Sequence, residues 1–129
     1  MKSLTLFTNR LHLARLLFAA AVVTALVMAC LPQPPRMGLN LSDKGQHAIA
    51  FVVLTALARA AFPGLGKAWI FAGLAAFGGL IEVIQAIPAL GRDPSLMDWL
   101  ADWLAIGVTL GLIGLVWEFC GRRRHTAVA

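Results

Sequence analysis

Polar and ionisable residues recur at helical spacing in three short stretches of an otherwise apolar chain. Three pairs stand out, each separated by three or four positions: Asp43 with His47, Glu82 with Gln85, and Asp98 with Asp102. Residues three or four apart share one face of a helix, so each pair can direct two polar groups from one helix toward a common site. Carboxylates and an imidazole in such a site can bind a ligand by hydrogen bonds or transfer protons.

Each of these residues also has a purely structural interpretation. Ser95 and Asp98 have the spacing of a capping box, and Asp43 with Gln46 has a weaker version of it. Such residues satisfy free backbone N–H groups and the positive end of a helix dipole. His47 alone is more typical of a hydrogen-bonded interfacial histidine than of a ligand. For Asp43 and Asp98 capping and function are equally good interpretations, since a cap can also serve a site.

The elements that must position these pairs are apolar segments long enough to cross a bilayer. The chain of 129 residues is 60% hydrophobic and 13% charged, with a mean hydropathy of +0.81. A soluble domain hardly tolerates this composition. Because one span takes ~20 apolar residues, four spans fill the chain. We therefore expect a single all-α domain over 1–129, an integral membrane bundle of four transmembrane helices at about 11–31, 43–62, 67–87 and 96–120.

The basic residues divide unequally between the two sides that such a bundle would have. One side receives Lys2, Arg10, Arg15, Arg59, Lys67, Arg122, Arg123 and Arg124, and the other receives Arg36, Lys44 and Arg92. The positive-inside rule places the larger group, and with it both termini, in the cytoplasm. Since the basic residues lie at segment ends rather than along one face, they indicate orientation and not nucleic-acid binding.

The first segment has a competing interpretation as a cleaved signal. It has a basic start and an apolar run, and Val27 to Cys30 distantly resembles a lipoprotein cleavage site. Met28 fits such a site poorly. Removal of the segment would also put the two groups of cytoplasmic charge on opposite sides of the membrane, so a first transmembrane helix is the better interpretation.

With this orientation, a set of polar residues falls at the outer face. The set comprises Asp43, Lys44, His47, Glu82, Gln85, Arg92, Asp93, Ser95, Asp98 and Asp102. Glu82 is the most informative, because it follows a long apolar run and precedes Pro88, where the chain leaves the membrane. An unpartnered carboxylate there costs on the order of 2 to 3 kcal/mol. We expect Arg92, Lys44 or His47 to be its partner.

Small, aromatic and sulfur-containing residues suggest how the helices pack. Ala75 with Gly79 and Gly107 with Gly111 are small-xxx-small steps that allow close helix approach. Tryptophans toward the ends of the third and fourth segments, at positions 69, 99, 103 and 117, are placed as interfacial anchors. Cys30 and Cys120 fall on opposite sides of the bilayer, too far apart for a disulfide.

The order and spacing of the polar residues resemble the VanZ-like family. The matching residues are Asp43-Lys44-x-x-His47-x-x-x-Phe51, Ile81-Glu82-x-x-Gln85 and Arg92-x-x-Ser95-x-x-Asp98-x-x-x-Asp102. The resemblance covers residues 43 to about 111. It departs at Asp102, where the family often has Asn, and at Ala105, where a Gly is common. It implies a small, multi-pass protein of the bacterial inner membrane. The family's namesake is associated with low-level resistance to the glycopeptide antibiotic teicoplanin.

Three classes of function fit these residues, and we favour the first. In a non-enzymatic envelope or glycopeptide-tolerance factor, Arg92 and Lys44 would engage anionic groups of a ligand, while Glu82, Asp98 and His47 exchange hydrogen bonds with it. In an intramembrane enzyme acting on a lipid or cell-wall precursor, His47 would be the base and Glu82 or Asp98 the acid or the group that orients the base. A proton-coupled transporter ranks last, because the inner half of each span is nearly all apolar.

The partners that we expect follow from these classes. They are the lipid bilayer and an envelope component such as a lipid-linked cell-wall precursor, with no nucleic acid. We predict no cofactor and no metal, since one histidine and scattered acids are a weak metal signal. No residue is placed as an obvious nucleophile, because Ser95 has the position of a helix cap. A homo-oligomer is compatible with the sequence.

Overall fold

The computed structural model describes residues 2–32 and 43–126, with the backbone alone described at positions 2–5, 7, 43 and 121–126. All regular structure in this part of the chain is helical. The elements are α1 (Lys2–Cys30), α2 (Asp43–Ala61), α3 (Lys67–Gln85), a short 3-10 helix η1 (Pro88–Leu90) and α4 (Leu96–Thr126). Helix α1 begins at Lys2 rather than near residue 11, and α4 continues to Thr126 rather than ending near residue 120.

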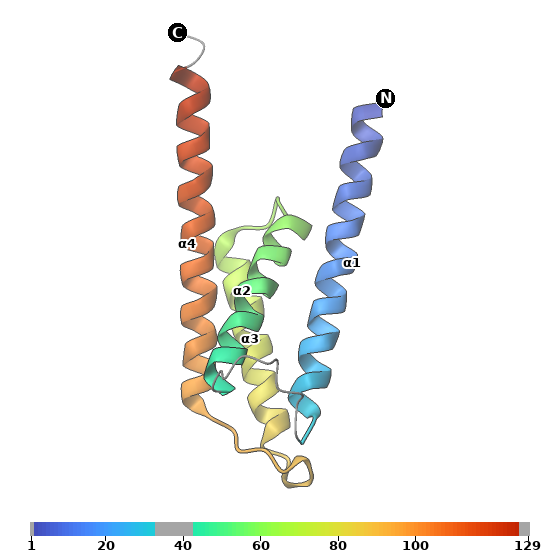
Figure 1. The fold of residues 1–129 in the computed structure, drawn as a ribbon, viewed down its shortest axis with the longest axis vertical. Coiled ribbons are helices and arrows are strands. Elements are labelled where there is room, and N and C mark those ends of the chain that lie inside the picture. Colours follow the sequence, from blue (N-terminus) through green and yellow to red (C-terminus); the bar gives the residue numbers. More distant parts are fainter. Residues whose placement is uncertain (1, 33–42, 127–129) are drawn as a thin grey trace.

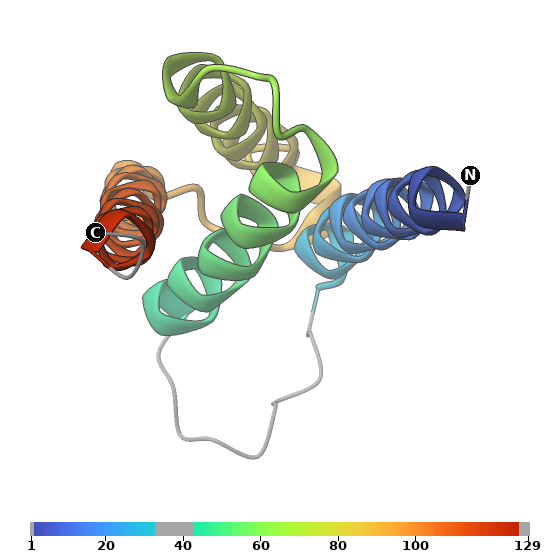
Figure 2. The same cartoon turned by 90° about the horizontal axis from the view of Figure 1, so that it is seen from above.

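The helices form an open bundle around α2. Seen from above, α2 lies between α1, α3 and α4, and it packs on all three (Figure 2). The start of α1 and the end of α4 lie at the same end of the molecule and project beyond the turn between α2 and α3 (Figure 1). We call this the terminal end, and the other, which contains the loop from α3 to α4, the loop end. The eight Lys and Arg positions that the positive-inside rule assigned to the cytoplasm all belong to the terminal end.

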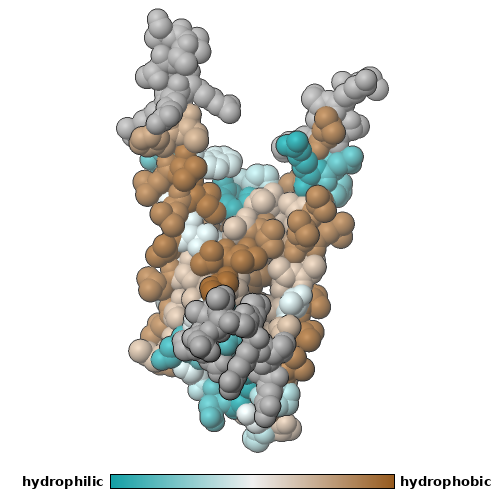
Figure 3. Space-filling model, viewed as in Figure 1, coloured by the Kyte–Doolittle hydropathy of each residue, from teal (hydrophilic) through white to brown (hydrophobic). Residues whose placement is uncertain are grey.

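Three helices are long and apolar enough to cross a membrane, over Thr8–Cys30, Lys67–Gln85 and Leu96–Cys120. Many of their large side chains are exposed, including Leu16 at 68% and Leu104 at 69%. Hydrophobic side chains cover the flanks formed by α1 and α4, while hydrophilic ones gather at the loop end and near the projecting part of α1 (Figure 3). This distribution is consistent with a membrane protein, since lipid is a solvent for exposed apolar surface.

The fourth expected span, α2, is not among the three candidates in the described residues. Its first turns carry Lys44, Gln46 and His47, and its last turn carries Arg59, so its mean hydropathy is lower. The four-span prediction is therefore supported for three helices.

The core lies along α2, where Phe51, Leu54 and Ala58 are almost completely buried. They belong to one apolar cluster with residues of α3 and α4, among them Ile106, which is fully buried. Small residues let the helices approach closely. A β-carbon added at Gly78 of α3 would lie 2.9 Å from the Oδ2 atom of Asp102, closer than real side chains pack.

The two small-residue steps behave differently. On α3, Gly79 lies against Trp99. A β-carbon added at Gly79 would be 3.4 Å from the indole ring. On α4, a β-carbon at Gly107 would reach Phe71 only at 3.8 Å, and one at Gly111 would meet nothing within 4 Å among the described residues. The expected close approach is therefore found at the α3 step and not at Gly111.

Basic side chains at the terminal end bind backbone carbonyl groups. Arg59 donates through Nη1 to the carbonyl oxygens of Pro63 and Leu65, at 3.1 and 3.3 Å. Arg15 donates through Nε to the carbonyl of Ala61, the last residue of α2, at 3.3 Å. The Ala61 carbonyl has no intrahelical N–H group to pair with, because it lies at the end of α2. Arg15 therefore caps α2, while Arg59 binds the turn that connects α2 to α3.

Candidate functional site at the loop end

The site is centred on an ion pair between α2 and α4. The Nδ1 atom of His47 lies 3.7 Å from the Oδ1 atom of Asp102. The Asp102 side chain is fully buried, and that of His47 is 14% exposed. The distance is within ion-pair range and longer than a direct hydrogen bond. His47 and Asp102 were both predicted as site residues, and the structure brings them together.

Close packing explains how Asp102 reaches this position. Gly78 leaves room on α3 for the carboxylate, with Phe51 and Trp99 completing the walls around it. Neither carboxylate oxygen has a hydrogen-bond partner within the part of the chain that the structure describes. A buried carboxylate without a partner is strongly disfavoured, so a positive charge on His47 would be stabilised here.

Glu82 is hydrogen-bonded to a helix N-terminus, and of its expected partners His47 interacts with it electrostatically. Its Oε2 atom accepts a hydrogen bond of 2.6 Å from the backbone N–H of Ser95. Ser95 directly precedes α4, and its Oγ atom accepts a hydrogen bond of 3.3 Å from the backbone N–H of Asp98, which confirms its role as a cap. The N-terminus of α4 carries a partial positive charge that stabilises a nearby carboxylate.

This arrangement alters the capping box that the sequence predicted. In a complete box the Asp98 carboxylate would bind the Ser95 N–H group, but Glu82 from α3 occupies that donor. The Oδ1 atom of Asp98 and the Oε1 atom of Glu82 are consequently buried without hydrogen-bond partners among the described residues. Asp98 therefore contributes charge to the site, while Ser95 and Glu82 together cap the helix.

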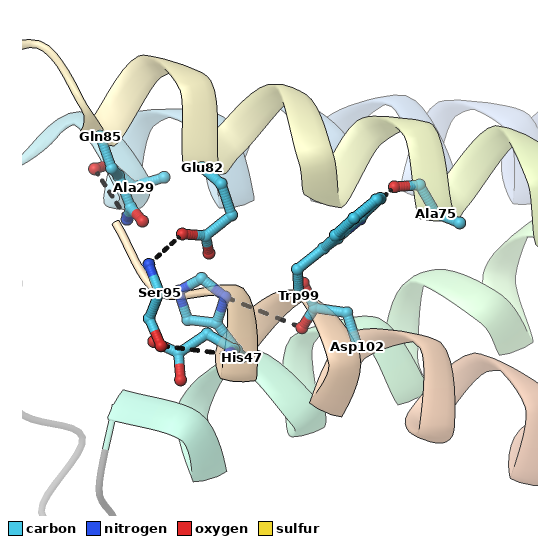
Figure 4. A network of polar contacts seen from close by, with 9 residues as sticks. Ala29, His47, Ala75, Glu82, Gln85, Ser95, Trp99 and Asp102 are labelled. Atoms are coloured by element: carbon cyan, nitrogen blue, oxygen red, sulfur yellow. Dashed lines mark hydrogen bonds and ion pairs between the residues drawn. The ribbon is translucent and has the colours of Figure 1, made fainter. Parts of the chain in front are cut away.

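The three helices direct their acidic groups toward one imidazole. His47 interacts electrostatically with Asp102, Asp98 and Glu82. The side chains of α2, α3 and the first turns of α4 converge at the loop end (Figure 4). We call His47, Glu82, Asp98 and Asp102 the acidic cluster. Its members are hydrogen-bond acceptors and a titratable base, which suits binding of a donor or transfer of a proton.

The remaining predicted site residues lie around the cluster rather than in it. Gln85 is buried and turns toward α1, where its Nε2 atom donates to the carbonyl of Ala29 at 3.4 Å. Lys44 is exposed in the first turn of α2, and Arg92 is half-buried in the loop before α4. The side chain of Asp43 lies outside the described residues.

Trp99 is part of the site, which the sequence interpretation missed. Its indole N–H donates a hydrogen bond of 2.8 Å to the Ala75 carbonyl, and its ring packs edge-on against Trp103 at a centroid distance of 4.9 Å. The prediction that Trp99 is an interfacial anchor did not include these contacts with α3 and Trp103. The signal that could have found it is the run of small residues on α3, which needs a large partner to fill the space opposite.

A groove lies beside the cluster, between α3 and the start of α4. Its volume is about 510 Å³, and it is open along one side. Glu82 and Ser95 form its polar part, and the other lining residues are apolar, including Val83, Leu96 and Trp99. Because Val83 and Leu96 are 68% and 66% exposed, the groove opens on the apolar outer surface.

Neither a metal ligand set nor a disulfide is found in the described residues. No three histidine, cysteine, aspartate or glutamate side chains there have an arrangement that could hold a metal ion. Cys30 and Cys120 are both free thiols.

Comparisons with known proteins returned no relative of this chain. No protein-family model matches it, and no curated protein or solved structure matches it significantly.

Proposed function

We propose that this chain is a VanZ-like protein of the bacterial inner membrane, and that its acidic cluster is a binding site for an envelope component. One observation carries the proposal: four buried carboxylate oxygens at one end of the bundle lack hydrogen-bond donors in the described residues. They belong to Glu82, Asp98 and Asp102. Leaving a buried acceptor unpaired costs about 1 to 3 kcal/mol. A ligand that supplies donors would recover this free energy on binding.

The proposed topology has four spans, with α2 as the fourth. Its 19 residues extend about 28 Å at 1.5 Å per residue, close to the ~30 Å of a bilayer core. Ile49, Val52 and Val53 are all more than 40% exposed, which gives α2 an apolar face for lipid. The basic residues of the terminal end favour the cytoplasm for both termini, and the acidic cluster then faces outward.

A complementation experiment tests the binding role. A deletion strain would carry the wild-type gene, Glu82→Gln or Glu118→Gln, and be assayed for tolerance of teicoplanin and envelope stress. Glutamine keeps an oxygen that can accept the Ser95 N–H bond and removes only the charge. Glu118 is exposed near the end of α4 and serves as the matched control. We expect Glu82→Gln to fail and Glu118→Gln to complement, with equal membrane levels by immunoblot.

If Glu82→Gln complements as well as Glu118→Gln does, the charge of Glu82 has no part in function. The carboxylate would then be a helix cap only, and the binding role would lose its central residue.

One observation favours an intramembrane enzyme as the second candidate. A buried carboxylate facing Nδ1 of a histidine is the arrangement that orients an imidazole as a general base in hydrolases. Asp102 takes this position here, where the sequence had suggested Glu82 or Asp98, and the base would be the Nε2 atom of His47. Reconstituted vesicles containing a lipid-linked precursor would show turnover that His47→Ala abolishes while the fold is retained. A wild-type protein that turns over no precursor would exclude this candidate.

A further inference from the structure

The groove beside the acidic cluster has the properties of a lipid site with a charged end. Its volume of about 510 Å³ lies within the range of roughly 300 to 1,000 Å³ found for small-molecule sites. Gly79 and Trp99 are among the residues that line it, and its apolar rim faces the outer surface. A molecule that enters it from the side would come from the membrane.

The charge at the polar end of the groove is negative. Glu82 forms that end, and its Oε1 atom has no hydrogen-bond partner among the described residues. Its other oxygen is held by the Ser95 N–H group, which fixes the carboxylate in place. Asp98 of the same cluster has a further buried carboxylate oxygen without a hydrogen-bond donor among the described residues, whereas Asp102 is paired with His47. A phosphate group alone would be repelled by this surface, whereas an ammonium group would be attracted.

We propose that the groove binds an aminophospholipid, with its primary ammonium group at Glu82 and one acyl chain along Val83, Leu96 and Trp99. This inference rests on the proposed binding function and names its ligand class. A primary ammonium carries three N–H donors, whereas a trimethylammonium headgroup has none. Charge-assisted hydrogen bonds to carboxylates are among the stronger ones in proteins. The site therefore prefers an ethanolamine headgroup to a choline headgroup of the same net charge.

Trp99 provides a direct readout, because bromine atoms on an acyl chain quench tryptophan fluorescence only at short range. The full chain with Trp69, Trp103 and Trp117 changed to phenylalanine keeps Trp99 as its single tryptophan. It would be reconstituted in phosphatidylcholine vesicles containing acyl-brominated phosphatidylethanolamine or acyl-brominated phosphatidylcholine at equal mole fractions. From the strength of a charge-assisted hydrogen bond we expect about a tenfold preference for the ethanolamine lipid.

Two controls make the result specific. A second variant that keeps only Trp69, which is 72% exposed at the start of α3, reports the surrounding lipid and should be quenched equally by both lipids. Adding Glu82→Gln to the Trp99 variant preserves the cap of α4 and removes the charge, so the headgroup preference should disappear.

Equal quenching of Trp99 by the two lipids, or a preference that survives Glu82→Gln, would overturn the lipid assignment. Protection of Trp99 from both lipids that increases with protein concentration would also overturn it, and would assign the groove to a second copy of the chain. The complementation experiment with Glu82→Gln remains a separate measure. Loss of complementation without lipid preference would refute the ligand class and leave the binding role in place.

Discussion

Replacing Gly78 by alanine should destabilise the bundle by bringing α3 into conflict with the two helices that form the site. The added β-carbon would lie 2.9 Å from the Oδ2 atom of Asp102 and 3.2 Å from side-chain carbons of Phe51 and Trp99. Overpacking of this kind costs about 1 to 3 kcal/mol, against a gain of up to about 1 kcal/mol in helix propensity.

The matched control for this change is Gly73→Ala on the same helix. A β-carbon at Gly73 meets nothing within 4 Å among the described residues, so this variant receives the propensity gain without the clash. We expect Gly78→Ala to be less stable than Gly73→Ala by about 1 to 3 kcal/mol, which is roughly a 5- to 150-fold difference in the unfolding equilibrium constant.

The assay is reversible unfolding in mixed detergent and SDS micelles, followed by circular dichroism, with both variants in the same detergent. Equal stability of the two variants would contradict the close approach of α3 to Asp102 at Gly78.

Two further predictions concern the start of α4 and use the same unfolding assay. Ser95→Ala removes the cap on the Asp98 N–H group and should lower the free energy of unfolding by about 1 kcal/mol. Ser95→Asn preserves a capping oxygen and should lower it much less. Equal stability of the two variants would contradict the capping role. Trp99→Phe keeps an aromatic ring but removes the hydrogen bond to the Ala75 carbonyl, so it should cost about 0.5 to 1.5 kcal/mol. Trp69→Phe, at an exposed position, should change stability by less than about 0.5 kcal/mol, and a larger effect there than at Trp99 would contradict the assignment.

Hydropathy and punctuation by proline and glycine were sufficient to predict an all-helical chain and the approximate position of each helix. They were insufficient for the outer ends of α1 and α4. Residues such as Lys2 and Arg10 lie outside the apolar runs, so a hydropathy pattern ends before them, but the backbone remains helical through them. The limit of an apolar segment is set by the bilayer, whereas the end of a helix is set by local hydrogen bonding.

Helical spacing predicted which polar residues share a face but not which helices would meet. It placed His47 and Asp102 at the same end of the bundle, yet their contact results from the packing of α2 on α4, which spacing within one helix does not predict. The hydrogen-bond donor to Glu82 could not be found by matching charges, because it is the backbone N–H of Ser95 and carries no side-chain signature. Trp99 was missed as a site residue for a similar reason: its position near a helix end suggested only an interface, and its contacts with Ala75 and Gly79 depend on how α3 packs against α4.

The central claim is that His47 and Asp102 act as a unit in a functional site. The most direct test compares complementation by His47→Ala, Asp102→Asn and the double variant in the deletion strain, at matched membrane levels. We expect each single variant to lose function and the double variant to be no worse than either, since removing one partner disables the pair. Full complementation by either single variant, with the protein present at wild-type level, would contradict it.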